Sequence, residues 1–362
     1  MRALFLPLVV LALANAAFAA GPPVRFDRSG DTVRVLVDEK PVATYHMGDQ
    51  DIPRPHFRDV FTLNGERITR PCPPAPAAYK GNDDHATFHP GIWLAFGDLG
   101  GEDFWRNKAP VRHVRFEGDF IEGDGFGSFT VVNRYERSDG GTPVCTETCT
   151  WSVRVAGDEG WLLSCDSVFR SDDADFAFGD QEEMGLGIRL DSPLTKKFGP
   201  GRLSNSEGGE DEKGTWGKQA AWCRTVGVIK ERTVGAAVIP SPGNFRPSWF
   251  HSRDYGLIVA NPFARKAMTA PDDDNAAPDK TVVRKGEGFR LGFGVFVFSV
   301  PKDTPLEMEK TLQRLGADRP REHSGVIHGT GRPKARRHHR SGAHGPGHGG
   351  AASCRGMVRV RV

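Results

Sequence analysis

After its first 20 residues the chain lacks any hydrophobic run long enough to cross a membrane. A spanning helix needs about 20 consecutive apolar residues, and no later segment approaches that length. The N-terminus has the pattern of a secretory signal, with Arg2 before the apolar run 3–13 and small residues at Ala17 and Ala19. We therefore expect residues 1–19 to be a signal peptide, and the mature protein to be soluble in the periplasm or outside the cell.

The main part of the chain also lacks a surplus of basic residues. Of the 48 Lys and Arg residues, eight lie between His323 and Val362, where there is no Asp or Glu. The rest of the chain therefore carries 40 basic against 46 acidic groups, a formal charge of −6. A folded nucleic-acid-binding domain needs a basic face, so the composition argues against nucleic acid as the partner.

The C-terminal segment has almost no aliphatic residues. From residue 319 it is rich in Gly, His, Arg and Pro until the closing MVRVRV, and such a composition cannot bury enough apolar surface to fold. We predict a disordered basic tail over residues 319–362 and a single large domain over residues 20–318. The oligomeric state stays open.

Cysteine is sparse, and its spacing fixes no disulfide framework. Six are present, of which Cys145 and Cys149 lie four apart on one expected strand. Residues so placed share a face but are roughly 13 Å apart, so these two do not bond to each other. No second thiol or imidazole pair stands at zinc-site spacing. The expectation is buried free thiols.

Helical periodicity is nearly absent. Alternating strand patterns with β-branched and aromatic residues begin at Val33, Pro41, Val111, Gly127, Val144, Trp161, Met184, Thr225, Thr233, Tyr255 and Phe289. Only residues 304–316 carry helix signals: a capping box from Thr304 to Glu307, an apolar stripe and a closing Gly316. The pattern predicts an all-β protein, a large antiparallel β-sandwich with one short C-terminal helix.

The segment NDDHATFHPGIWLAFGD, residues 82–98, concentrates chemistry in one place. It sets His85 and His89 among acids and before an apolar run that contains Trp93. Only six of the 12 histidines lie outside the tail, so two within five residues suggest a site. The alternative is a polar loop leading into a strand, with histidines that are hydrogen-bonded for structure.

A second concentration lies in PSWFHSRDYGLIVANPF, residues 247–263. Trp249, His251, Arg253 and Tyr255 alternate, so on an extended segment they project to one side. Aromatic rings stack on sugars, while Arg and His bind hydroxyls or carboxylates. The alternative is a strand whose aromatics pack inward and whose Arg and His pair with acids such as Asp254.

Two further segments add candidates. In EEMGLGIRL, residues 182–190, Glu183 and Arg189 share a strand face with glycines between them, which marks close approach of a ligand or backbone. A structural ion pair between the two is an equal alternative. The run RPHF contributes Arg54 and His56 before a turn.

Together these segments resemble the bacterial PmoA-like family of unassigned function, often labelled methane oxygenase PmoA. The matching runs are RPHF at Arg54, DDHATFHPGIWLAFGD at Asp83, DFW at Asp103, EEMGLGIRL at Glu182, WGKQAAW at Trp216 and WFHSRDYGLIVANPF at Trp249. The chain departs from the family's D-H-P-x-H-R-G pattern, because Ala86 replaces its proline and Pro90 stands where an arginine is expected.

The resemblance implies an exported galactose-mutarotase-like β-sandwich related to carbohydrate-active proteins. Methane oxidation is set aside, because it needs a membrane-embedded copper enzyme and this sequence has no transmembrane segment. Fold alone does not give function.

The first hypothesis is a carbohydrate-active enzyme with lyase, epimerase or hydrolase chemistry on a sugar or uronate. The predicted general acid–base residues are His85, His89, Glu183 and His251. The predicted substrate-binding residues are Arg54, His56, Trp93, Arg189, Trp249, Arg253, Tyr255 and Asn261. A classical hydrolase needs two carboxylates, and only Glu183 stands out, which favours lyase or isomerase chemistry.

The hypothesis needs no cofactor. A divalent metal bound by Asp84, His85, His89 and His251 is a minor option. The second hypothesis is a non-catalytic carbohydrate-binding or structural surface protein, which the proline at residue 90 favours.

Overall fold

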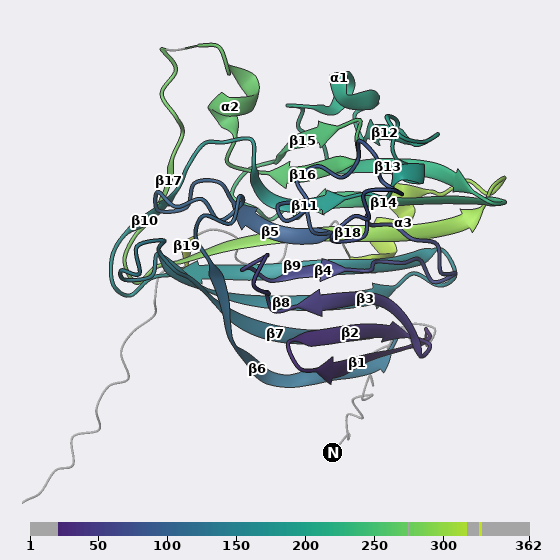
Figure 1. The fold of residues 1–362 in the computed structure, drawn as a ribbon, viewed down its shortest axis with the longest axis horizontal. Coiled ribbons are helices and arrows are strands. Elements are labelled where there is room, and N and C mark those ends of the chain that lie inside the picture. Colours follow the sequence, from purple (N-terminus) through teal and green to yellow (C-terminus); the bar gives the residue numbers. More distant parts are fainter. Residues whose placement is uncertain (1–20, 274, 317–325, 328–362) are drawn as a thin grey trace, which may run out of the picture. The chain divides into compact units, whose positions relative to one another are not determined.

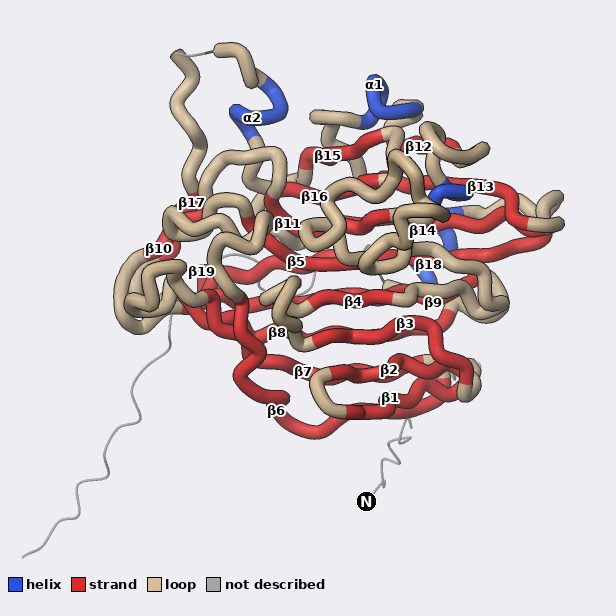
Figure 2. The backbone as a smooth tube through the Cα atoms, in the orientation of Figure 1, coloured by secondary structure: helices blue, strands red, loops and turns tan. Residues whose placement is uncertain are grey.

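Hydrogen-bonded ladders join 17 strands into one continuous antiparallel sheet that folds into two layers. The layers meet along one edge, where Pro23 and Val24 pair with Asp124 and Gly123. In Figure 1 the two layers overlap in projection, and Figure 2 shows how few helices accompany them. The expected large antiparallel β-sandwich is confirmed.

The computed structural model describes residues 21–273, 275–316 and 326–327. These residues belong to one compact unit. The expected signal peptide and nearly all of the expected tail lie outside the described residues.

The first layer has the strand order β1-β2-β3-β4-β5-β11-β16-β15, with every neighbouring pair antiparallel. Its strands are β1 (Pro23–Ser29), β2 (Thr32–Val37), β3 (Lys40–His46), β4 (His56–Arg58), β5 (Ile92–Phe96), β11 (Met184–Arg189), β16 (Leu257–Asn261) and β15 (Trp249–Arg253).

The second layer has the order β6-β7-β8-β9-β18-β14-β13-β12, again antiparallel throughout. Its strands are β6 (Val111–Asp124), β7 (Phe126–Tyr135), β8 (Cys145–Val155), β9 (Gly160–Arg170), β18 (Gly288–Pro301), β14 (Arg232–Pro240), β13 (Cys223–Ile229) and β12 (Arg202–Asn205). A short β19 (Val326–Ile327) pairs with β18, while β10 (Phe176–Phe178) and β17 (Thr281–Val283) form a separate ladder.

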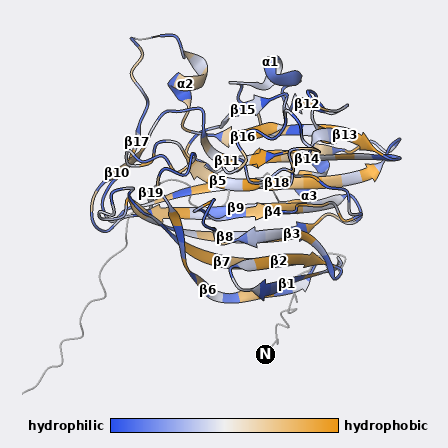
Figure 3. Ribbon diagram, viewed as in Figure 1, coloured by the Kyte–Doolittle hydropathy of each residue, from blue (hydrophilic) through white to orange (hydrophobic). Residues whose placement is uncertain are grey.

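The core lies between the layers because alternate residues of each strand point inward. On β2, for example, Val33, Val35 and Val37 are buried in the same cluster as Trp151 of β8 and Phe293 of β18. Figure 3 shows the resulting hydrophobic colouring along the central strands. Five cysteines, including Cys145 and Cys149, are free thiols, and four of the five are buried.

Short helices cover the edges and one outer face of the sandwich. They are α1 (Asp211–Thr215), α2 (Arg265–Thr269), α3 (Met308–Leu315) and a 3-10 turn, η1 (Ser192–Leu194). The apolar stripe of α3 packs on Phe296 and Phe298 of β18. No helix of the described residues is long and apolar enough to cross a membrane.

The C-terminal helix is present, but its predicted capping box does not form. The cap residue is Glu307, which makes no side-chain capping bond, and the helix starts only at Met308. Glu307 instead pairs with Lys310 at 2.7 Å. Gly316 ends the helix in the left-handed conformation, with φ 67°, as expected.

A buried glutamate interrupts the apolar face of β8. Glu147 points between the layers, where it accepts hydrogen bonds from Ser167 Oγ at 2.7 Å and Asn133 Nδ2 at 3.0 Å. Burial raises the pKa of the Glu147 carboxyl above its usual 4.5, and these hydrogen bonds only partly offset the effect. The folded protein therefore favours the protonated form of Glu147.

We predict that Glu147→Gln changes how stability depends on pH. The raised pKa gives the wild type a stability contribution that is complete below pH 4.5 and lost as the pH rises through the folded value. The variant lacks this loss, so its stability relative to the wild type rises with pH, by up to about 1.4 kcal/mol per pH unit over that window.

Urea unfolding of the wild type and the variant, at pH values about one unit apart between roughly pH 4 and 8, measures this difference in stability. Glu117→Gln, on the exposed strand β6, is the matched control for removing one negative charge. A constant difference between Glu147→Gln and wild type across this range would contradict the prediction.

Candidate functional site

The candidate residues gather on the outer face of the first layer, over β5, β11, β16 and β15. On these strands the residues that point away from the core are also buried, among them Trp93, Leu257 and Val259. Loops from residues 47–55, 69–91 and 97–110 supply the cover, which includes Arg54, His89 and Trp105. The central strands are therefore buried on both faces, with a polar site under the loops.

Asp84 and His85 form a carboxylate–imidazole pair at the rim of this site. Asp84 Oδ2 contacts His85 Nδ1 at 2.5 Å. Because an ionised carboxylate only accepts, this contact places the imidazole proton on Nδ1 and leaves Nε2 as a base. The His85 side chain is 45% exposed, and its backbone lies in the left-handed region at φ 49°. Such strain in a residue other than glycine is common at functional sites.

Two buried arginines hold Asp84 in place. Arg189 Nη2 donates to Asp84 Oδ1 at 2.6 Å and also to Asn82 Oδ1 at 2.6 Å. Arg70 Nη1 donates to the carbonyls of Asn82 and Asp84 at 2.7 and 2.9 Å. Partial burial opposes ionisation of Asp84, but Arg189 and His85 outweigh it and hold the pKa of this carboxyl below its usual value.

Three rings form a stack that runs inward from His85. His85 stacks on His89 with ring centroids 4.9 Å apart, and His89 stacks on Trp93 at 5.2 Å. Trp105 meets Trp93 edge to face. Burial, followed by the nearby Arg189, lowers the pKa of His89 well below its usual value, so this imidazole is neutral.

Glu183 faces the same region from the entry of β11. Its carboxylate forms an ion pair with Arg106, which also contacts Asp103 at 3.2 Å. Burial raises the pKa of Glu183, and Arg106 only partly counters this effect. When His85 takes up a proton, its charge also lowers the pKa of Glu183. The sequence alternative of a Glu183–Arg189 ion pair is not formed, because each residue has a different partner.

His251 and Arg253 of β15 form a second charged group with two glutamates. Arg253 contacts Glu182 at 3.1 Å and Glu212 at 2.9 Å, and His251 lies 3.2 Å from Glu182. Burial, with help from Arg253, lowers the pKa of His251 to about 3. His251 is therefore a neutral, buried imidazole. These acids are not the Asp254 that the sequence suggested.

Trp249 and Tyr255 do not share one exposed strand face, as the sequence predicted. Trp249 is only 8% exposed and packs against Ala264 and Met268. Tyr255 lies in the turn after β15, not on the extended strand, and its ring covers the Arg189 guanidinium at 4.2 Å. Half-buried Trp216 lies beside Arg253, 5.5 Å from its guanidinium, and is an aromatic surface that the list of candidates omitted.

The glycines of β11 are explained by packing within the protein. A side chain on Gly187 would meet the Trp93 indole at 2.8 Å, and one on Gly185 would meet the Ala260 carbonyl oxygen at 2.1 Å. The atoms that approach these glycines closely therefore belong to Trp93 and Ala260 of the protein itself.

Three predicted binding residues serve as internal supports. Arg54 is buried and donates to the carbonyls of Phe104 and Trp105 at 3.1 and 2.6 Å. His56 contacts the Arg54 carbonyl at 2.9 Å. Asn261 donates to the carbonyls of Gln181 and Glu182 at 2.7 and 3.1 Å.

Charges connect the separate groups into one site. Tyr255 interacts with Arg189 and Asp84 on one side and with Arg253 and Glu183 on the other. Arg106 acts on both Glu183 and His251. The three sequence segments therefore meet, since Arg189 pairs with Asp84 and Arg253 pairs with Glu182. Prediction missed Arg106, although it directly follows the DFW run, because one arginine in a loop has no distinctive pattern.

No group of three or more His, Cys, Asp or Glu side chains suited to a metal occurs among the described residues. Both carboxylate oxygens of Asp84 are engaged by His85 and the arginines, and His89 lies between two rings. The four candidate metal ligands named from the sequence therefore do not form one set.

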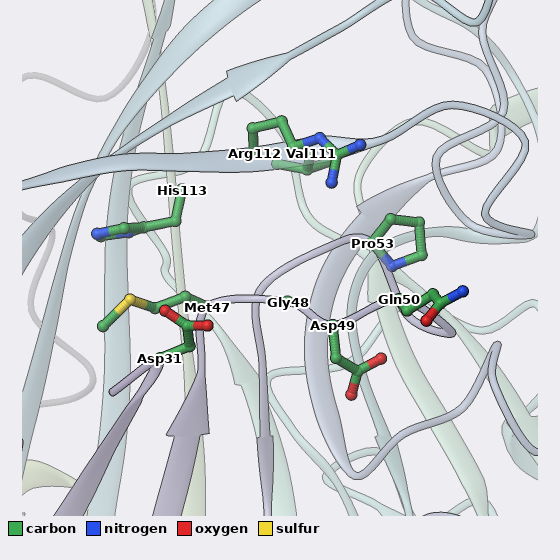
Figure 4. Close-up of a pocket in the computed structure, with 9 residues that line it drawn as sticks. All are labelled: Asp31, Met47, Gly48, Asp49, Gln50, Pro53, Val111, Arg112 and His113. Carbon is green, nitrogen blue, oxygen red and sulfur yellow. The ribbon is translucent and has the colours of Figure 1, made fainter. Parts of the chain in front are cut away.

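A cavity of about 270 Å³ lies elsewhere, between the start of β2, the end of β3 and the start of β6 (Figure 4). It is lined by Asp31, Met47, Gly48, Asp49, Gln50, Pro53, Val111, Arg112 and His113. None of the candidate site residues borders it, so this hollow and the candidate site are separate features.

Fold and site define an antiparallel two-layer β-sandwich with a cluster of ion-paired carboxylates, arginines and histidines on the covered face of one layer. The chain belongs to a family of unknown function, DUF6807, whose profile matches residues 32–313. This range contains every candidate site residue. A comparison with curated protein sequences finds no match.

Solved structures give only distant fold neighbours. A galactose mutarotase-like protein from Lactobacillus casei is 9% identical, with 76% of this chain and 99% of that one covered at a TM-score of 0.33. A GalM/aldose epimerase homologue from C. elegans is 11% identical, with coverages of 77% and 99% and a TM-score of 0.31.

The GH36 α-galactosidase AgaA from Geobacillus stearothermophilus is 11% identical with a TM-score of 0.34. There the alignment covers 77% of this chain but only 40% of the enzyme, so the chain spans less than half of that enzyme's length. At these scores the neighbours carry no functional argument, and the strand pairings define the fold.

We predict that Asp84→Asn destabilises the protein by about 2 kcal/mol, because Arg189 loses its carboxylate while it stays buried. The loss is smaller than for a fully buried pair because Asp84 is partly exposed. Chemical denaturation at neutral pH measures it. Asp83→Asn, one residue earlier and exposed, is the matched control, and equal effects of the two changes would contradict the role of Asp84.

Proposed function

We propose that this protein is an exported carbohydrate-active enzyme that performs lyase or epimerase chemistry on a sugar or a uronate. The observation that carries the proposal is the Asp84–His85 pair, anchored by buried Arg189 at the end of the strand β11 that Glu183 directly precedes. A base and an acid on one face of a sheet are what proton transfer on a sugar ring requires.

In this proposal His85 is the general base. Asp84 orients its ring and stabilises the imidazolium that forms when Nε2 takes a proton. Glu183 is the general acid, since its burial favours the protonated carboxyl. His89 and His251, which are buried and neutral, position the rings and carboxylates around this pair and do not exchange protons with substrate.

Substrate recognition is proposed for the half-exposed groups of the site. Trp216 and Tyr255 offer aromatic surface for a sugar ring, while Trp93 and Trp249 are covered by protein. The proposed location in the periplasm or outside the cell rests on the N-terminal signal pattern, and the PmoA-like resemblance supports an exported carbohydrate-related role.

The alternative is a protein that binds carbohydrate without converting it. One observation favours it: Asp84, Glu182, Glu183 and Glu212 all have arginine partners. Paired carboxylates of this kind also build purely structural networks.

We expect His85→Ala to lower turnover at least about a hundredfold, the usual contribution of a general base, while sugar binding remains. Product formation from uronate-containing oligosaccharides and binding by calorimetry are measured together. His113→Ala, which changes a histidine at the separate cavity, is the control. If the wild type binds sugar but forms no product, the enzyme proposal is wrong and the carbohydrate-binding alternative remains.

A further inference from the structure

Arg106 differs from the other arginines of the site in being accessible. Arg54, Arg70 and Arg189 are at most 2% exposed and are held by carbonyl groups or by Asp84. Arg253 is held between two glutamates. The Arg106 side chain is 39% exposed and lies in the loop between β5 and β6. It is therefore the guanidinium best placed to meet a ligand.

The two carboxylate partners of Arg106 depend on it to different degrees. Asp103 has a second cation, Lys108, at 3.4 Å, and it accepts from the Arg106 backbone N–H at 2.9 Å. Glu183 has no cation besides Arg106 within ion-pair distance in the part of the chain that is described. If Arg106 turns toward a new carboxylate, Asp103 stays paired and Glu183 does not.

We propose that Arg106 recognises a carboxylate on the substrate and exchanges Glu183 for it, so that the site takes acidic sugars such as uronates. This inference rests on the function proposed above and names the class of substrate that its site would take. The guanidinium suits such an exchange, because Nη1 contacts Asp103 while Nη2, which contacts Glu183, can donate to a substrate carboxylate instead.

The exchange also prepares Glu183 for its role. Without Arg106, Glu183 is left with its burial and with the negative charges of Glu182 and Asp103, which raise its pKa and outweigh the smaller opposing effect of His85. Only an acidic substrate triggers this change. The substrate carboxylate is thus both the group that Arg106 recognises and the cause of the protonation of Glu183.

The chemistry of elimination fits the same substrate. The carboxylate acidifies the neighbouring C–H, from which His85 Nε2 takes the proton. The C–H electron pair forms the new C=C bond, the C–O bond to the leaving group breaks, and Glu183 gives its proton to the departing oxygen. For epimerisation the C–O bond stays intact, and Glu183 gives its proton to the same carbon from the face opposite His85.

The test compares D-glucuronate and D-galacturonate with D-glucose and D-galactose by calorimetry on the full chain. Wild type is expected to prefer the two acids, and Arg106→Gln to weaken their binding about tenfold or more while neutral sugars bind as before. Arg106→Lys should restore part of the loss. Arg112→Gln, an exposed arginine on β6, should change nothing.

A second measurement follows the Glu183 carboxyl itself by carbon NMR. Glucuronate should raise its titration midpoint in the wild type but not in Arg106→Gln, a response that a merely structural arginine would not produce. Equal binding of acidic and neutral sugars, unchanged by Arg106→Gln, would overturn the role of Arg106 and leave the proposed function standing. Binding of none of the four sugars would overturn both.

Discussion

The contact between Asp84 and the buried guanidinium of Arg189 is the interaction on which the site depends. Arg189 ends β11 with no exposed surface, so its charge requires a partner at that point. That requirement fixes the loop carrying Asp84 against the sheet, and with it the strained backbone of His85. The loop in turn covers the outer faces of β5 and β11 and places His89 on Trp93. A structural ion pair thus sets the position of the proposed base.

The rest of the site divides into a rigid floor and an adjustable rim. Buried arginines and neutral histidines form the floor, where removal of one partner leaves an unpaired buried charge. At the rim, the Arg106 and Glu182 side chains are 39% and 43% exposed, so rearranging their ion pairs costs little. Glu183 is more buried and can lose its partner by taking up a proton. Binding energy from a ligand can therefore change the rim without disturbing the sheet, which is the arrangement expected of a site that responds to its substrate.

Much of the fold was predictable because period-two alternation follows directly from the pleat of a strand. It identified the long strands of the second layer, such as β7, β8 and β9. The start of α3 was misplaced because Thr304 and Glu307 satisfy a local capping pattern that the tertiary contacts do not use. Glu147 shows the same limit: its place on an inward face was readable, but the Asn133 and Ser167 partners that make it tolerable come from other strands.

For the site, the sequence by itself determined the three segments that carry charged and aromatic residues, since such clusters are rare on purely apolar faces. Only the tertiary structure decided which of them face a ligand. Trp249 and Trp216 look equivalent in sequence, yet Trp249 is buried against Ala264 and Met268, whereas Trp216 is only partly buried and lies beside Arg253. Glu183 and Arg189 share a strand face, yet they pair with Arg106 and Asp84, which come from distant loops. Sequence fixes local periodicity, whereas burial and charge pairing depend on which residues the folded sheet and its covering loops bring together.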